Sequence, residues 1–233
     1  MPAGPISSAS FRCWAAAAAR AVARQLLGAL ALCVVLPQPG LAIDWLVLVV
    51  DRSMSVDDRE LALQRNAYVR LLSDAGVVGA LGGARVAIVE FDTSSQIVVD
   101  WTDPQSAAQA YRRKPPDGLR GQTGIGGALT TALALLVGKS GRQVIDISGD
   151  GRENVDHALL AQARAAASAR AIEINGLAIV TPETPDLDRY YSASVVTGFV
   201  LPVEQRDDFL AALKRKLFYE VAELRPPAAA AWR

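Results

Sequence analysis

The chain of 233 residues contains little cysteine and histidine, and each shortage excludes a class of protein. Its two cysteines, Cys13 and Cys33, lie within the first 42 residues, so the rest of the chain needs no disulfide even in an oxidising compartment. Its one histidine, His157, has no second histidine or cysteine to join it in binding zinc. Beyond residue 42 the sequence therefore offers neither a disulfide framework nor a zinc site.

Basic stripes and long apolar runs are also missing beyond residue 42. Removing the first 42 residues takes away three of the 24 basic residues and none of the 24 acidic ones, which leaves a net charge of −3. A mildly acidic chain with no run of like charge is not expected to bind nucleic acid. No segment of this part is long and apolar enough to span a membrane.

The N-terminal segment has the composition of a secretory signal. It carries three arginines, an apolar core over residues 26–36, and the small residues Gly40 and Ala42 where a signal peptidase reads them. We therefore expect residues 1–42 to be a signal peptide and the mature protein to be periplasmic or secreted. A retained membrane anchor is an alternative, although the apolar core is short. Lipidation of Cys33 is a second alternative, opposed by the large residue that precedes it.

Strand patterns and helix patterns alternate along the rest of the chain. Strand patterns cover residues 45–50, 84–91, 95–101, 142–148, 172–180 and 199–203. Helix patterns cover residues 57–75, 103–114, 126–137, 155–169, 187–194 and 207–223. This alternation predicts a doubly wound α/β domain over residues 43–223, with helices on both faces of a mainly parallel sheet. Only three residues separate the second strand from the third, so the third should be an antiparallel edge strand. Residues 224–233 are expected to be a disordered tail.

Oxygen-bearing side chains follow the first strand pattern. Asp51 comes directly after residues 45–50, and Ser53 and Ser55 stand two and four positions later. Ligand sites in parallel sheets lie at the carboxyl ends of the strands. Carboxylate and hydroxyl oxygens suit Mg²⁺, Mn²⁺ or Ca²⁺ rather than zinc or copper. The motif therefore predicts a site for a hard divalent cation.

Two later segments offer further ligands of the same kind. Thr123 lies in a glycine-rich loop ahead of a helix pattern, and Asp150 follows the strand pattern of residues 142–148. Three loops can therefore converge with three hydroxyls and two carboxylates. The alternative is that the serines and Thr123 merely cap the helices that follow them. Independent capping, however, does not require Asp51 and Asp150 at two strand ends.

At these residues the chain resembles the von Willebrand factor A domain. The metal-ion-dependent adhesion site (MIDAS) of that family consists of an Asp-x-Ser-x-Ser motif, a distant Thr and a distant Asp, in this order. The five positions are filled here by Asp51, Ser53, Ser55, Thr123 and Asp150. The resemblance extends from about residue 44 to residue 223. Within this range the sequence is similar to a bacterial subfamily without an assigned function. It implies a Rossmann-like fold and a metal-bound Asp or Glu from a partner protein.

The donor set favours binding over catalysis. Three neutral hydroxyls and two carboxylates leave a divalent cation incompletely neutralised, so it takes one more anionic oxygen. We therefore expect an exported, metal-dependent interaction module that is not an enzyme. The alternative is a phosphatase-like hydrolase with Asp51 as nucleophile, opposed by Ser53 where a second Asp is expected and by the lack of a lysine in the Thr123 and Asp150 loops. A third class is a scaffold that has lost its metal.

Three other polar residues fall within strand patterns that should be buried. They are Glu90, Asp146 and Asn175. Because buried polar groups are nearly always hydrogen-bonded, we expect them to form a network beneath the site. The glycine-rich loop of residues 121–127 matches neither Gly-x-Gly-x-x-Gly nor a phosphate loop, so a nucleotide site has no support.

Overall fold

The computed structural model describes residues 42–54, 58–114 and 121–224. Within them lies a six-stranded sheet with the strand order β3-β2-β1-β4-β5-β6. The strands are β1 (Trp45–Asp51), β2 (Arg85–Phe91), β3 (Ser95–Thr102), β4 (Gln143–Gly149), β5 (Glu173–Ile179) and β6 (Val200–Val203). All neighbours pair in parallel except β2 and β3, which are antiparallel. The predicted mainly parallel sheet with one antiparallel edge strand is therefore confirmed.

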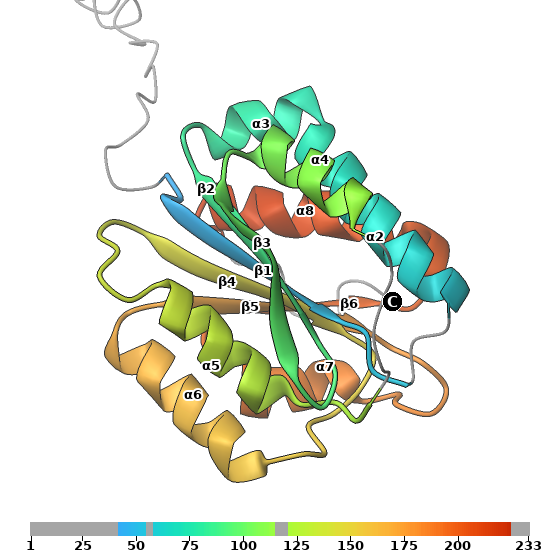
Figure 1. Ribbon diagram of the computed structural model, residues 1–233. Coiled ribbons are helices and arrows are strands. Elements are labelled where there is room, and N and C mark those ends of the chain that lie inside the picture. Colours follow the sequence, from blue (N-terminus) through green and yellow to red (C-terminus); the bar gives the residue numbers. More distant parts are fainter. Residues whose placement is uncertain (1–41, 55–57, 115–120, 225–233) are drawn as a thin grey trace, which may run out of the picture. The chain divides into compact units, whose positions relative to one another are not determined.

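Helices cover both faces of this sheet (Figure 1). One face carries α2 (Asp58–Ser73), α3 (Ala75–Leu81), α4 (Pro104–Arg113) and α8 (Phe209–Val221). The other carries α5 (Ile125–Leu135), α6 (His157–Ala169) and α7 (Leu187–Tyr190). A π-helical turn, Tyr191–Val195, continues α7, and a 3₁₀ turn, Arg206–Asp208, precedes α8. The domain is therefore doubly wound, as the alternating patterns predicted.

The central strand β1 is buried on both sides. Leu46, Leu48 and Val50 belong to the apolar cluster under α2, α4 and α8, whereas Val47 and Val49 belong to the cluster on the other face. A strand with two covered faces has a continuous apolar run in its sequence, as β1 does. Burying each of these side chains stabilises the fold by about 1.5–3 kcal/mol. The carboxyl end of β1 is consequently a rigid support for the loop that begins at Arg52.

The predicted helix of residues 57–75 is two helices in the structure. Helix α2 ends at Ser73, and the Asp74 carboxylate accepts hydrogen bonds from the N–H groups of Gly76 and Val77 at 3.0 and 3.1 Å. An aspartate in this position caps a new helix, α3, instead of continuing the first. The sequence did not predict α3, because its seven residues include two glycines and lack a clear apolar repeat.

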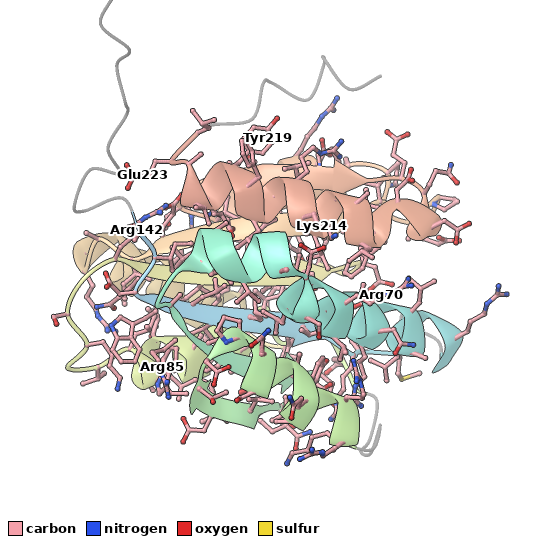
Figure 2. The ribbon with its side chains drawn as sticks, turned by 90° about the horizontal axis from the view of Figure 1, so that it is seen from above. Arg70, Arg85, Arg142, Lys214, Tyr219 and Glu223 are labelled. Carbon is pink, nitrogen blue, oxygen red and sulfur yellow. The ribbon has the colours of Figure 1, made fainter. Side chains whose placement is uncertain are left out.

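Helix α8 is tied to the sheet through Arg142, which precedes β4. The Arg142 guanidinium donates to the Glu220 carbonyl at 2.7 Å, and it forms ion pairs with Glu173 at 3.1 Å and Glu223 at 3.5 Å. Figure 2 shows Arg142 and Glu223 near one end of α8, with Lys214 farther along the helix. Among the described helices, none is long and apolar enough to cross a membrane.

Candidate metal centre

Three loops meet at the carboxyl ends of β1 and β4. The two strands pair in parallel, with Val50 opposite Ser148, so their ends lie side by side. The N–H of Met54 donates to the Gly121 carbonyl at 3.0 Å. The N–H of Asn154 donates to the Thr123 carbonyl at 3.1 Å. These bonds join the loop after β1, the loop before α5 and the loop after β4.

Asp51 is fully buried where β1 ends. Its Oδ1 accepts the N–H of Ser53 at 2.8 Å, whereas its Oδ2 has no hydrogen-bond partner among the described residues. Burial, with the neighbouring charge of Asp150, raises the pKa of Asp51 to about 7. A buried carboxylate oxygen without a partner is uncommon, and a cation would satisfy it.

Two of the predicted hydroxyl ligands touch each other. The Thr123 hydroxyl donates to Ser53 Oγ at 3.1 Å, and both side chains are buried. The Asn154 side chain holds Thr123 in place by accepting its N–H at 2.7 Å. Thr123 does not cap α5, whose N-cap residue is Gly124. Ser55, the third predicted hydroxyl, lies outside the described residues.

Asp150 follows β4 and is 3% exposed. Its backbone carbonyl accepts the Thr184 hydroxyl at 3.2 Å, which links it to the loop after β5. The next residue, Gly151, brings this loop against Thr123: a Cβ at Gly151 would lie 2.6 Å from Thr123 Oγ1. Glycine is therefore the residue that permits the close approach. Four of the five predicted ligands, Asp51, Ser53, Thr123 and Asp150, thus lie around one point in the fold.

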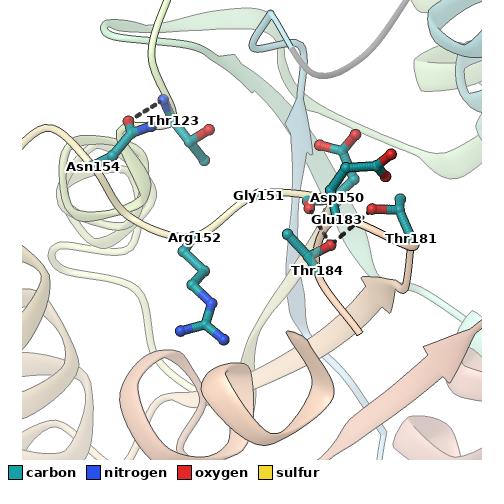
Figure 3. A pocket seen from close by; sticks show the side chains of 8 residues that line it. All are labelled: Thr123, Asp150, Gly151, Arg152, Asn154, Thr181, Glu183 and Thr184. Atoms are coloured by element: carbon teal, nitrogen blue, oxygen red, sulfur yellow. Dashed lines mark hydrogen bonds between the residues drawn. The ribbon is translucent and has the colours of Figure 1, made fainter. Parts of the chain in front are cut away.

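A pocket of about 510 Å³ opens beside these residues. It is lined by Thr123, Asp150, Gly151, Arg152, Asn154, Thr181, Glu183 and Thr184. Figure 3 shows Thr123 and Asn154 on one side of it and Asp150 and Glu183 on the other. Arg152 forms an ion pair with Asp186, and its guanidinium lies 5.2 Å from the centre of the Tyr190 ring. The pocket therefore combines hydroxyl, amide, carboxylate and guanidinium groups next to Asp150.

Sequence reasoning missed the residues that hold the loops together. Glu153, which is 2% exposed, accepts the N–H of Gly126 at 2.6 Å, and its other oxygen accepts those of Val155 and Asp156 at 2.7 and 3.0 Å. Glu153 thereby fixes the start of α5 next to Thr123. A polar pair such as Glu153 and Asn154 in a loop carries no periodic signal, and their partners in front of α5 lie 27 and 31 residues away.

The three polar residues predicted to be buried all have partners. Glu90 accepts the Tyr111 hydroxyl at 2.8 Å and lies 3.5 and 3.6 Å from the guanidinium groups of Arg52 and Arg65. Asn175 Oδ1 accepts the N–H of Phe199 at 2.9 Å. The third residue, Asp146, pairs with Lys216 at 2.8 Å. Each is at most 1% exposed, so their hydrogen bonds and ion pairs are structural.

Solved structures that are similar to this fold include von Willebrand factor A domains. Proximal thread matrix protein 1 of the mussel byssus aligns with a TM-score of 0.60 and 15% identity, over 78% of this chain and 47% of that one. A von Willebrand factor type A protein from Catenulispora acidiphila aligns at 0.58 and 16%, over 77% and 43%. BatB from Bacteroides thetaiotaomicron aligns at 0.57 and 19%, over 77% and 99%. The chain thus spans less than half of the first two proteins. It has a von Willebrand factor A-like fold.

Within that class, the chain belongs to the family described as protein of unknown function DUF1194, whose model matches residues 43–225. Among proteins with a curated description, none matches the sequence. A further structure of the mussel protein is described as having a zinc-occupied MIDAS motif. That metal belongs to the mussel protein.

Proposed function

We propose that this protein is an exported interaction module that binds one divalent cation and, through it, a carboxylate of a partner protein. Asp51, Ser53, Ser55, Thr123 and Asp150 would hold the cation. When bound, it would supply a positive charge that attracts an Asp or Glu side chain. Mg²⁺ is the ion that this all-oxygen donor set favours, with Mn²⁺ or Ca²⁺ as substitutes.

One observation carries this proposal. Asp51 Oδ2 is buried without a hydrogen-bond partner among the described residues, in a site that also contains Asp150 and the paired hydroxyls of Ser53 and Thr123. Such a donor set fits a hard cation, which would satisfy the unpartnered oxygen and reduce the repulsion between the carboxylates. The described residues contain no group of three or more His, Cys, Asp or Glu side chains that could hold a metal, so hydroxyl ligands are essential.

The surroundings of the site suit contact with another protein. The pocket beside Asp150 is open, and Met54, next to Ser53, exposes 75% of its surface. An exposed methionine can pack against varied partner surfaces. The role of the chain's own residues would be to orient the cation, while the partner would supply the remaining anionic oxygen.

Calorimetric titration of the purified mature protein with Mg²⁺ and with Mn²⁺ tests the cation site. We expect one site per chain, and we expect Asp51→Ala to abolish it because the variant lacks the buried carboxylate. Asp100→Asn, which removes an exposed carboxylate on β3, is the control and should bind like the wild type. Equal binding by wild type and Asp51→Ala would contradict the assignment.

Thr123→Ala separates a binding module from a hydrolase. It removes one neutral ligand and no charge, so the variant should lose a Mg²⁺-dependent partner in a pulldown from periplasmic extract. It should keep its fold, with a thermal midpoint in EDTA close to that of Thr130→Ala, because each of these variants loses one hydroxyl hydrogen bond. Thr130→Ala, in the middle of α5, is the matched control. A hydrolase with Asp51 as nucleophile would instead turn over p-nitrophenyl phosphate and lose that activity in Asp51→Asn. Reproducible Asp51-dependent turnover would overthrow the interaction module.

Export is the remaining part of the proposal. Cleavage after Ala42 would release a protein that begins at Ile43, two residues before β1. N-terminal sequencing of the protein recovered from the periplasm or the medium checks this. A start at Cys33 would indicate a lipoprotein, and an intact Met1 would indicate a retained anchor.

A further inference from the structure

Tyr191 has a buried hydroxyl that the fold leaves unsatisfied. The side chain is fully buried, and its Oη has no hydrogen-bond partner among the described residues. Its ring packs edge-on against Tyr190, with 6.3 Å between the ring centres, and lies in the apolar cluster under α5 and α6. Buried tyrosine hydroxyls usually have a partner, so this one requires an explanation.

The Tyr191 hydroxyl points to the same small space as the unpartnered oxygen of Asp51. A Cβ built at Gly149 would lie 2.7 Å from Tyr191 Oη and 2.6 Å from Asp51 Oδ2. Both oxygens therefore border the position where any other residue would carry its Cβ. Gly149 keeps that space open, and two buried polar atoms without partners border it.

The chemistry of the two groups is complementary. A tyrosine hydroxyl is protonated at neutral pH and can donate a hydrogen bond. An ionised carboxylate can only accept. In metal sites, the ligands are commonly oriented by hydrogen bonds from residues that do not touch the metal.

We propose that Tyr191 is a positioning residue of the cation site, whose hydroxyl is the hydrogen-bond donor that orients the Asp51 carboxylate toward the cation. This inference rests on the function proposed above. The two groups are not hydrogen-bonded to each other in the structure, so this hydrogen bond would form across the space over Gly149 when Asp51 holds the cation, which would give Gly149 a role beyond its place in β4. A purely structural Tyr191 would fill the core with its ring and have no use for its hydroxyl.

Tyr191→Phe tests this role because it removes the hydroxyl and keeps the ring. Calorimetric titration of the mature protein with Mg²⁺ should show affinity weakened by about 10–100-fold, the usual cost of losing such a supporting hydrogen bond. In EDTA the thermal midpoint should equal or exceed that of the wild type, because the lost hydroxyl has no partner in the fold.

Tyr68→Phe is the matched control. Tyr68 is equally buried, but its hydroxyl donates to Ser148 Oγ at 2.9 Å. This variant should therefore show the reverse result, a lower thermal midpoint in EDTA and an unchanged Mg²⁺ affinity. Equal Mg²⁺ affinity of Tyr191→Phe and wild type would overturn the positioning role and leave the cation site standing. No Mg²⁺ binding by the wild type would overturn both.

Discussion

Among the buried acidic side chains of this domain, two pairs are surrounded differently by the fold. Asp146 and Glu220 share the ammonium group of Lys216, which lies 2.8 Å from one carboxylate and 2.6 Å from the other. Asp51, next to Asp150, has one carboxylate oxygen bonded to a backbone N–H. Its other oxygen has no hydrogen-bond partner among the described residues, as is also true of one oxygen each on Asp146 and Glu220, so the difference between the pairs is the lysine. All five side chains are at most 3% exposed.

The difference separates a structural cluster from the proposed cation site. In the Lys216 cluster the chain supplies its own cation from α8, so the group is largely complete when the protein has folded. At Asp51 the hydrogen-bond partner is a backbone N–H, and the nearest groups that the sequence motif predicts are the hydroxyls of Ser53 and Thr123, none of which carries a positive charge. Buried charge of this kind is costly unless something pairs with it. This cost is the physical reason for proposing that Asp51 and Asp150 bind a cation from solution.

The largest expected effect comes from removing the buried ammonium group of Lys216. Lys216→Met leaves the carboxylates of Asp146 and Glu220 buried without a counter-ion, so we expect the free energy of unfolding at pH 8 to fall by about 3–5 kcal/mol. Urea denaturation measures this loss. Lys214→Met, two residues away on α8, removes only the surface ion pair with Asp74 and should change stability little. Similar losses in the two variants would mean that the Lys216 cluster does not carry the stability assigned to it.

The next effect is a pH dependence centred on Glu220. Burial raises the pKa of Glu220 to about 7 against the opposing attraction of Lys216. The charged or titratable groups near it are Lys216 on α8, Asp146 on β4, Glu173 on β5, Tyr68 on α2 and Arg142 before β4. Because the folded state binds the proton more tightly than the unfolded state, this stability is complete below about pH 4.5. It is lost as the pH rises toward 7 and beyond.

Glu220→Gln should remove that dependence. Relative to the variant, the wild type should lose on the order of 1–3 kcal/mol of unfolding free energy between about pH 4.5 and pH 8. Urea denaturation of both proteins at several pH values, in EDTA, provides the comparison. Asp51 titrates in the same range, but it is common to both proteins and cancels in the difference. Parallel pH profiles would contradict the raised pKa of Glu220.

The smallest expected effect distinguishes the two sites by the sign of the change in unfolding free energy that an Asp→Asn substitution causes. Asp51→Asn removes a buried charge beside Asp150, so it should raise the free energy of unfolding in EDTA by about 1–2 kcal/mol. Asp146→Asn should lower it, because that substitution deprives Lys216 of a charged partner. Saturating Mg²⁺ should then stabilise the wild type and not Asp51→Asn. Destabilisation by both substitutions in EDTA would remove the contrast between the sites.

Much of the candidate site is determined by local sequence pattern. Asp51 and Asp150 each come at the end of an apolar run, and Thr123 precedes a helix pattern. In a doubly wound sheet with right-handed connections, such positions fall at one edge of the sheet. The five-residue motif therefore indicated the fold and the location of the site together. The family comparison and the sheet order confirm the fold, whereas the metal ligation stays a prediction.

The roles of other residues could not be predicted from the sequence pattern, because their partners are far away in the sequence. Lys216 stands next to Leu217 on α8, where a lysine ordinarily faces solvent, and its burial depends on Asp146, which is 70 positions away in the sequence. Tyr191 gives the signal of a core aromatic residue, and only its position above Gly149 brings its hydroxyl near Asp51. Asn154 and Glu153 look like loop residues until the start of α5 is placed beside them.

The sequence by itself determined the six strands and every helix except α3, the strand ends that carry oxygen-bearing side chains, and the all-oxygen character of the proposed donor set. These properties depend on neighbours within a few residues, through apolar periodicity and turn chemistry. The tertiary structure alone decided which buried charges receive a cation from the chain and which do not. That outcome depends on distances between residues far apart in sequence, and the energy of a buried charge changes by several kcal/mol with the presence of one partner a few ångströms away.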